Sequence, residues 1–304
     1  MTGEKILITG LTGQVGEPIA RALAPENEVW GAARFSDPKV HERLQGYGVH
    51  CVPLDLASGD FAPLPDDFSY VLHFAVTKTH DFDRDLAGNA EGVGLLMRHC
   101  RKARAFLHCS STAVYEPKGH DSLKESDPLG DNHRPFGFLP TYSICKIAAE
   151  GAVRLSARLW QLPTTIARLN VPYGDFGGWP AFHLELMKMG RPVPVHVDAP
   201  SVYNPIHEDD LVSQLPGLLE AASVPATIVN WAGRDRVSIE EWCGYLGELT
   251  GLAAEFAPTD KTIESAAIDT TFLHERVGPS TIHWKEGFRR MVAARHPELL
   301  KPKD

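Results

Sequence analysis

The chain lacks any apolar run long enough to cross a membrane as a helix, and lysine and arginine form no block in its 304 residues. The formal net charge of −9 argues against a nucleic-acid-binding surface. Only 5 cysteines occur, without a paired spacing, and none of the 14 histidines forms a His-x-x-x-His pair, so we expect neither disulfides nor a metal site. The amino terminus, MTGEKILITG, is not typical of a signal peptide. These absences predict a cytoplasmic protein without nucleic-acid or membrane partners.

What remains is a globular composition, 43% apolar and 23% charged, with short apolar runs that alternate with segments of helical periodicity. Strands are predicted at residues 5–9, 28–33, 49–54, 70–76, 105–111 and 164–169, and helices at 14–24, 86–103 and 142–160. Such alternation is typical of parallel sheets with helices on both faces. The sequence therefore predicts an α/β fold with a Rossmann-type doubly wound parallel sheet, whose ligands lie at the carboxyl ends of the strands.

After about residue 169 the pattern loosens, because glycine and proline crowd the stretch NVPYGDFGGWP and only short elements follow. Helices are predicted near 182–189, after 207, at 238–251 and at 285–294, and strands at 192–197 and 227–233. We predict a Rossmann domain over residues 1–170. Residues 171–304 are predicted to form a smaller, mainly substrate-binding region, with some segments returning to the sheet.

Three glycines mark the junction of the first strand and the first helix. In LITGLTGQVG, Gly10 permits a tight turn, Gly13 lets backbone N–H groups approach a pyrophosphate, and Gly16 lets helix and strand pack closely. A strand–helix turn without a ligand is the alternative. The position directly after an amino-terminal buried strand favours a dinucleotide-binding site.

The end of the second strand, GAARFSD, bears on the choice of dinucleotide. NAD sites commonly place a carboxylate here, whereas this stretch offers Arg34 and Ser36, which suit the 2′-phosphate of NADP. Alternatively, Arg34 is solvated and Asp37 holds NAD. We predict NADP, with NAD as the alternative. Asp55, after the third strand, is predicted either to face the adenine or to cap a turn.

A tyrosine and a lysine lie four residues apart in LPTYSICKIAAEG, at the start of a predicted helix. Tyr142 could act as a general acid or base if its pKa falls from about 10 toward neutrality, and Lys146 one turn away could supply the field. Ser111, at the end of the strand 105–111, would reach the same edge of the sheet and hold a substrate oxygen. Combined with the nucleotide turn, these residues predict an acid–base centre.

Seven motifs in this order resemble the extended branch of the short-chain dehydrogenase/reductase superfamily, also called the NAD-dependent epimerase/dehydratases. They are TGLTGQVG, LDL, HFAV, NAEGVGLL, SSTAVY, YSICK and HEDDL, and they span nearly the whole chain. The resemblance implies that Ser111, Tyr142 and Lys146 are catalytic and that Lys146 also binds the nicotinamide ribose. The expected cofactor contacts are Gly10, Gly13, Gln14, Val15, Gly16, Arg34, Ser36, Asp55, Leu56, Phe74, Ala75, Val76, Asn89, Tyr142, Lys146 and Val171. Asn89 would contact the cofactor or support the catalytic strand.

Several positions depart from the family pattern. Thr112 and Ala113 replace the Asp-Glu pair of sugar-nucleotide 4,6-dehydratases, so dehydration is not expected. Val171 occupies the place of an asparagine that contacts the substrate diphosphate, with Asn170 displaced by one residue. Tyr203 and its neighbour Asn204 replace an Arg-Asp pair whose arginine holds the nucleotide phosphate.

The lost diphosphate contacts leave two interpretations of the substrate side open. Arg191 or His183 could compensate for the missing cation. Alternatively, Phe176, Trp179 and Tyr203 could line an apolar, aromatic pocket, or these rings could simply form the core of the small region. The substrate contacts that we predict are Thr112, Asn170 and Tyr203.

These observations favour an oxidoreductase that moves a hydride between NAD(P) and a secondary alcohol or ketone carbon of a small molecule. The alternative is a nucleotide-sugar epimerase with tightly bound NAD, and a third possibility is a non-catalytic NAD(P)-binding sensor. The acidic residues of HEDDL are expected to complement a helix dipole rather than to bind a metal. The resemblance also implies a homodimer that pairs the helices near 89–103 and 142–160.

Overall fold

A seven-stranded parallel sheet forms the centre of the computed structural model, which describes residues 1–134, 137 and 139–301. The strand order is β12-β6-β5-β4-β1-β2-β3, and every neighbouring pair is parallel. The strands are β1 (Lys5–Thr9), β2 (Glu28–Ala33), β3 (His50–Pro53), β4 (Tyr70–His73), β5 (Ala105–Ser111), β6 (Thr164–Leu169) and β12 (Thr227–Trp231). The predicted doubly wound α/β fold is confirmed.

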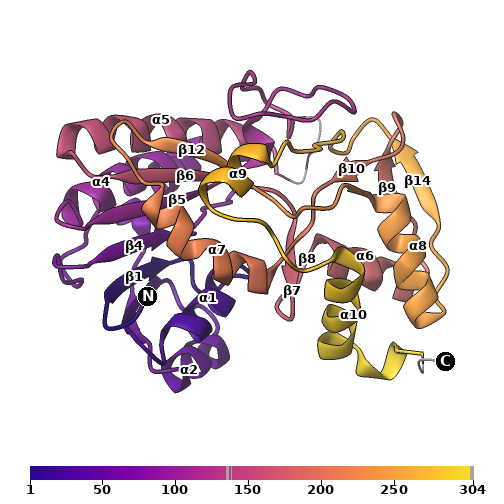
Figure 1. Ribbon diagram of the computed structural model, residues 1–304, viewed down its shortest axis with the longest axis horizontal. Coiled ribbons are helices and arrows are strands. Elements are labelled where there is room, and N and C mark those ends of the chain that lie inside the picture. Colours follow the sequence, from indigo (N-terminus) through magenta and orange to yellow (C-terminus); the bar gives the residue numbers. More distant parts are fainter. Residues whose placement is uncertain (135–136, 138, 302–304) are drawn as a thin grey trace.

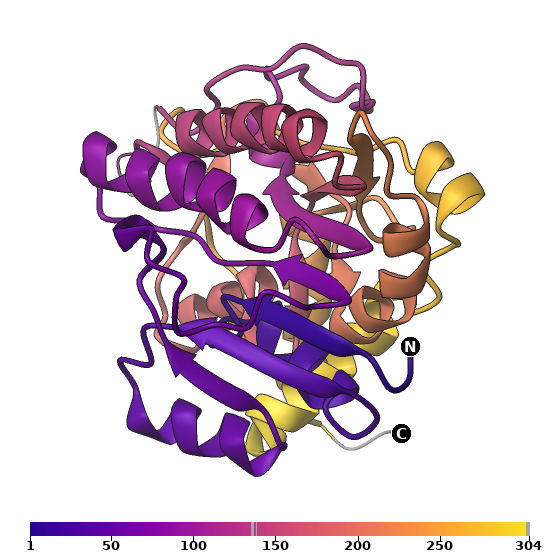
Figure 2. The same cartoon turned by 90° about the vertical axis from the view of Figure 1, so that its left-hand side faces the viewer.

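Helices cover both faces of the sheet, because the apolar runs of its strands must be buried on both sides. One face carries α1 (Gly16–Leu23), α2 (Pro38–Gly46), α7 (Glu208–Glu220) and α9 (Thr271–Arg276). The other carries α3 (Phe82–Leu86), α4 (Gly92–His99) and α5 (Tyr142–Trp160), and Figure 2 shows α4 and α5 side by side. Single helical turns, η1 (Leu56–Ser58) and η3 (Thr112–Val114), follow β3 and β5.

The helix predicted at 86–103 differs most from the structure. Helical backbone begins with α3, whose N-cap Asp81 accepts from the Arg84 N–H at 2.9 Å, passes through a π-helical segment (η2, Ala87–Glu91) and ends with α4. The prediction began late because it followed apolar spacing rather than the cap. Helix α2 was missed, although Asp37 caps it and Pro38 is its first residue.

A second core lies in the C-terminal region, which occupies the right of Figure 1. Its helices are α6 (Trp179–Lys188), α8 (Ile239–Thr250) and α10 (Trp284–Arg295), followed by η4 (Pro297–Leu299). Its short strands are β7 (Pro172–Gly174), β8 (Gly177–Gly178), β9 (Val193–His196), β10 (Val202–Tyr203), β11 (Ile206–His207), β13 (Val237–Ser238) and β14 (Phe256–Thr259). Helix α7 and strand β12 pack with the central sheet, although both lie after residue 170.

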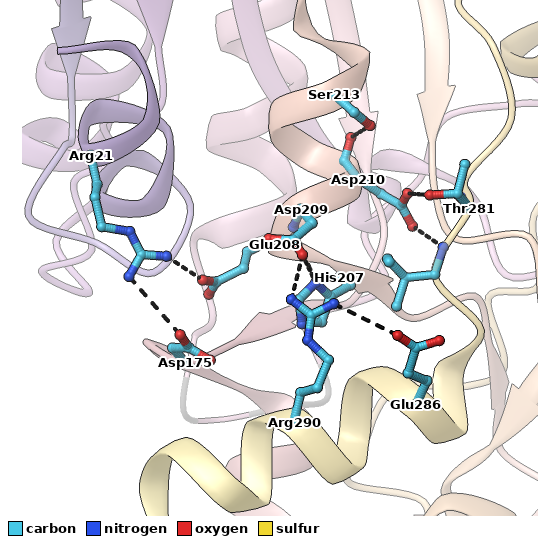
Figure 3. A network of polar contacts seen from close by, with 11 residues as sticks. Arg21, Asp175, His207, Glu208, Asp209, Asp210, Ser213, Thr281, Glu286 and Arg290 are labelled. Carbon is cyan, nitrogen blue, oxygen red and sulfur yellow. Dashed lines mark hydrogen bonds and ion pairs between the residues drawn. The ribbon is translucent and has the colours of Figure 1, made fainter. Parts of the chain in front are cut away.

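Ion pairs and hydrogen bonds join the two parts around the start of α7 (Figure 3). Arg21 of α1 lies 2.9 Å from Glu208 and 4.0 Å from Asp175, and Arg290 of α10 pairs with Asp209. Asp210 accepts from the Thr281 N–H at 2.8 Å. The acidic residues of HEDDL thus form structural contacts at a helix start, and the described residues contain no group of three or more side chains placed to hold a metal ion.

Within the same described residues, none of the helices combines the length and apolar character that a membrane crossing requires.

Candidate active site

A cavity of about 670 Å³ opens at the carboxyl ends of β1, β4, β5 and β6 and extends under the C-terminal region. It brings together the three predicted catalytic residues, all three predicted substrate contacts and most predicted cofactor contacts. From the predictions it is lined by Gly10, Gly13, Gln14, Val15, Phe74, Val76, Ser111, Thr112, Tyr142, Lys146, Asn170, Val171 and Tyr203.

A smaller cavity of about 90 Å³ adjoins it and shares Gly10 and Val76. Arg34, Leu56 and Ala75 line this second cavity. So does Asp55, whose side chain also accepts from the Ala57 N–H at 3.1 Å and so caps η1, one of its two predicted roles. Both cavities include residues at the carboxyl ends of strands of the sheet, where dinucleotides bind in folds of this kind.

Three predicted cofactor contacts line neither cavity. Gly16 lies where an added Cβ would be 2.6 Å from the Leu11 Cα, so its role is close packing of helix against strand. Ser36 is exposed in the loop before α2. Asn89 is buried and bonds to the N–H and C=O of Thr77 at 2.9 and 2.8 Å, so it supports the loop after β4.

The first glycine turn fits a phosphate group. Gly10 has a φ of +72°, and a Cβ there would lie 2.5 Å from the Ala75 nitrogen. Gly13 faces open space, because a Cβ there would meet only the Gly10 carbonyl oxygen, at 3.4 Å. Helix α1 begins without a side-chain cap. In its first turn the Glu17 N–H donates to the Gly13 carbonyl oxygen at 3.0 Å and Pro18 has no N–H, so contacts to a phosphate would come mainly from the glycine turn itself.

At the end of β2, the carboxylate that could hold a ribose is already engaged. Asp37 accepts from the Lys39 N–H at 2.9 Å as the N-cap of α2 and lines neither cavity. Arg34 is exposed and lines the smaller cavity. The cap uses only one oxygen of the Asp37 carboxylate, so what separates the two candidates here is that Arg34 lines the smaller cavity and Asp37 does not.

Ser111, Tyr142 and Lys146 converge in the larger cavity, because β5 ends at Ser111 and α5 begins at Tyr142. Interaction with the Ser111 side chain lowers the pKa of Tyr142 and opposes the effect of burial. Lys146 is only 5% exposed and donates to the Cys109 carbonyl oxygen at 2.8 Å. Burial raises the pKa of Tyr142 and lowers that of Lys146.

Two residues of the site were missed from the sequence, Lys78 and His133. The Lys78 nitrogen lies 5.2 Å from the centre of the Tyr142 ring, nearer than that of Lys146 at 6.0 Å, and its charge opposes the effect of burial on the Tyr142 pKa. The sequence had led us to expect that the charge of Lys146 lowers the Tyr142 pKa. Burial lowers the pKa of His133 to about 4, so its imidazole is neutral at pH 7, 4.9 Å from the Tyr142 ring.

Asp85 connects the loop after β4 to the start of α5. Its carboxylate accepts from the Thr141 hydroxyl and the Thr79 N–H, both at 2.7 Å, and so joins the loop that carries Lys78 to the residue before Tyr142. Burial alone would raise the pKa of Asp85, but these hydrogen bonds lower it below its ordinary value.

On the substrate side, polar groups bond mainly to one another. Asn170 donates to the Thr112 hydroxyl at 2.9 Å and to the Ala266 carbonyl at 3.1 Å, and accepts from the Asn204 N–H at 2.9 Å. The Tyr203 hydroxyl donates to two backbone carbonyls, those of residues 263 and 264, at 3.1 and 2.8 Å. These side chains line the cavity and at the same time belong to the internal structure.

The two predicted compensating cations do not reach the cavity. His183 is buried and accepts from the Trp242 indole N–H at 2.9 Å, and burial lowers its pKa to about 3, so it is uncharged at neutral pH. Arg191 is exposed and lines neither cavity. Phe176, Trp179 and Tyr203 do line the larger one.

The NAD dependent epimerase/dehydratase family model matches residues 6–215, which include both the glycine turn and the Tyr142–Lys146 helix. The chain belongs to this family. The family assignment and the enzyme class that the motifs predicted are thereby confirmed. No curated protein sequence matches the chain significantly.

Solved structures of nucleotide-sugar enzymes share the fold. UDP-glucuronic acid 4-epimerase from Bacillus cereus, in complex with UDP-glucuronic acid and NAD, is 19% identical with a TM-score of 0.82, over 95% of this chain and 98% of that one. UDP-N-acetylglucosamine 4-epimerase from Methanobrevibacter ruminantium is 17% identical with a TM-score of 0.82, over 97% and 98%. dTDP-glucose 4,6-dehydratase from Bacillus anthracis, in complex with NAD, is 17% identical with a TM-score of 0.81, over 95% of each chain.

Proposed function

We propose that this family member is an NAD(P)-dependent oxidoreductase that interconverts a secondary alcohol and a ketone at a Ser111–Tyr142–Lys146 centre. The observation that carries the proposal is that these three side chains line the same cavity as the glycine turn at Gly10 and Gly13. Oxidation of NADPH by the purified protein with a panel of ketones tests it. No oxidation above the rate without ketone, at saturating cofactor, would refute it.

The chain's residues suggest how the proton moves. When bound, the nicotinamide supplies or accepts the hydride. Tyr142 donates a proton to the ketone oxygen during reduction and removes it from the alcohol during oxidation, while Ser111 holds that oxygen by a hydrogen bond. Lys146 is largely buried and lines the larger cavity, where its ammonium group can bind a ribose hydroxyl and favour the phenolate. Lys78 adds a second positive charge beside the ring.

We propose NADP as the cofactor, because Arg34 lines the smaller cavity while Asp37 is engaged as a cap. Replacing Arg34 by alanine should weaken NADPH binding by about 10- to 100-fold and leave NADH binding nearly unchanged, as expected for the loss of a charge-assisted phosphate contact. Equilibrium titration of both cofactors measures this. Arg98→Ala, an exposed arginine on α4, is the matched control, and an unaltered NADPH affinity in Arg34→Ala would favour NAD.

A nucleotide-sugar 4-epimerase with tightly bound NAD is the second candidate. It is favoured by the solved structures of similar fold, two of which show UDP-glucuronic acid 4-epimerase in complex with NAD and a UDP-sugar. Such an enzyme would retain NAD through purification and show no net oxidation of added NADPH. Analysis of the cofactor released on denaturation separates the two candidates.

We further propose a homodimer formed through the outer face of α4 and α5. Leu95, Leu155 and Leu159 are 42%, 58% and 61% exposed there, in keeping with a covered apolar surface. Sedimentation equilibrium should give twice the chain mass of 33.4 kDa, and Leu155→Glu with Leu159→Glu should give a monomer. A wild-type monomer at micromolar concentration would contradict the proposal.

The remaining sequence predictions are retained as proposals. The division into a cofactor domain over residues 1–170 and a mainly substrate-binding region over 171–304 is supported by the separate cores of the two parts. A cytoplasmic location is supported by five cysteines that all stay free.

A further inference from the structure

The cavity wall that the C-terminal region contributes carries no charge among the described residues. Its lining residues are Val171, Pro172, Phe176, Trp179, Tyr203, Ile263 and Ala266. The positive charges that line the cavity, those of Lys78 and Lys146, lie instead at the sheet edge beside Tyr142. Arg21 and Arg43 lie 5.1 and 6.0 Å from the centre of the Phe176 ring but do not line the cavity. A charged group bound against Trp179, Tyr203 and Ile263 would therefore have no countercharge among the side chains that line this wall.

The polar atoms of this wall are also engaged. A strap formed by residues 263–268 bonds to Asn170, Tyr203 and Asn204, the last of which accepts from the Ile268 N–H at 2.8 Å. The Ala266 N–H donates to the Val202 carbonyl at 2.9 Å, which ties the strap to β10. Side chains at the positions where diphosphate contacts were expected thus hold the strap in place.

The start of α6 adds to the apolar character. A helix N-terminus could bind a phosphate through its free N–H groups, but α6 begins with Trp179 and Pro180, and proline has no N–H. The Trp179 ring lies 4.9 Å from the Tyr203 ring and 6.0 Å from the Trp242 ring, both edge-on. This arrangement gives the cavity a rigid aromatic wall.

We propose, on the basis of the oxidoreductase function proposed above, that the substrate is an uncharged secondary alcohol or ketone with an aromatic or bulky apolar body. The reacting carbon lies beside Ser111 and Tyr142, and the apolar body packs against Trp179, Tyr203 and Ile263. The uncharged side chains of this wall and the engaged polar atoms of the strap argue against a nucleotide-linked sugar.

Binding of two probes to the complex with NADP⁺ tests this. 1-Indanone should bind with a dissociation constant at least about 10-fold below that of UDP-glucose, measured by calorimetry. Trp179→Ala should weaken 1-indanone by about 10- to 100-fold without changing the NADP⁺ affinity. Phe182→Ala, on the same helix but 55% exposed, is the control and should change neither. UDP-glucose binding more tightly than 1-indanone, or an unchanged affinity in Trp179→Ala, would overturn the proposal.

A second variant serves if the loss of Trp179 prevents folding. Ile263→Lys places a cation on the partly exposed strap and should weaken the binding of 1-indanone while strengthening that of UDP-glucose. An unchanged ratio of the two affinities would contradict the proposal.

The binding measurements are separate from the test of the oxidoreductase function, because that function fails only if no ketone is reduced in a Tyr142-dependent manner. UDP-glucose preference together with Tyr142-dependent ketone reduction would overturn the substrate class alone.

Discussion

Replacing Tyr142 by phenylalanine should lower kcat by about 10²- to 10⁴-fold, the usual contribution of a positioned general acid or base. The phenyl ring keeps the contacts of the tyrosine ring with Lys78 and His133, so the cavity should keep its shape. The affinity for NADPH should therefore change little. Steady-state kinetics with equilibrium titration of the cofactor measures both quantities.

The pH profile adds a readout that a purely structural role would not change. In alcohol oxidation the rate should rise with pH, because Tyr142 accepts the proton only as the phenolate, and this limb should be absent in the residual activity of Tyr142→Phe. Tyr245→Phe, on α8 beside Trp284, is a matched control that should retain activity. Full activity in Tyr142→Phe would remove this residue from the mechanism.

Acidification should destabilise the fold strongly, because several histidines are buried in uncharged form. Burial lowers the pKa of both His73 and His183 to about 3 and that of His108 well below its ordinary value. In the unfolded chain these groups titrate near pH 6.5. Between about pH 6.5 and 3 the unfolded state therefore binds more protons, and the free energy of unfolding falls by about 1.4 kcal/mol per pH unit for each histidine.

His183→Gln isolates one of these contributions. Glutamine can keep an acceptor for the Trp242 indole N–H but does not titrate, so the slope of unfolding free energy against pH should decrease by about 1.4 kcal/mol per pH unit. Urea unfolding at pH 5.5 and pH 4.5, both between the unfolded and folded pKa values, gives the slope, which a pH-independent loss of packing does not alter. His50→Gln, at an exposed position, should leave it unchanged. An unaltered slope in His183→Gln would contradict the assignment.

The sequence predicted best those elements whose local signals and tertiary role agree. The bounds of β5 and β6 match the predicted 105–111 and 164–169, because each stretch has an apolar centre, Phe106–Leu107 and Ile166–Ala167, that is fully buried in the parallel sheet. The glycine turn could also be predicted from the sequence. Gly10 has a positive φ, and the backbone at Ala75 leaves no room for a side chain there. The backbone conformation of the turn and its packing against a distant strand end thus both require glycine.

Other parts of the site depend on contacts between distant segments, which periodicity does not encode. Lys78 comes to Tyr142 because Asp85 and Asn89 hold the loop after β4 in place, and nothing in its immediate sequence indicates this. The only available signal was its position shortly after a strand that ends at the ligand edge. His133 lies in the long connection between η3 and α5. This segment has no helical or strand periodicity from which the location of a side chain could be predicted.

The most direct test of the central claim is a crystal structure of the protein with NADP⁺. The account predicts the nicotinamide ring in the larger cavity beside Tyr142, its ribose bound by Lys146, and the 2′-phosphate at Arg34 in the smaller cavity. A nicotinamide bound outside the larger cavity, or a Tyr142 hydroxyl directed away from it, would contradict the account.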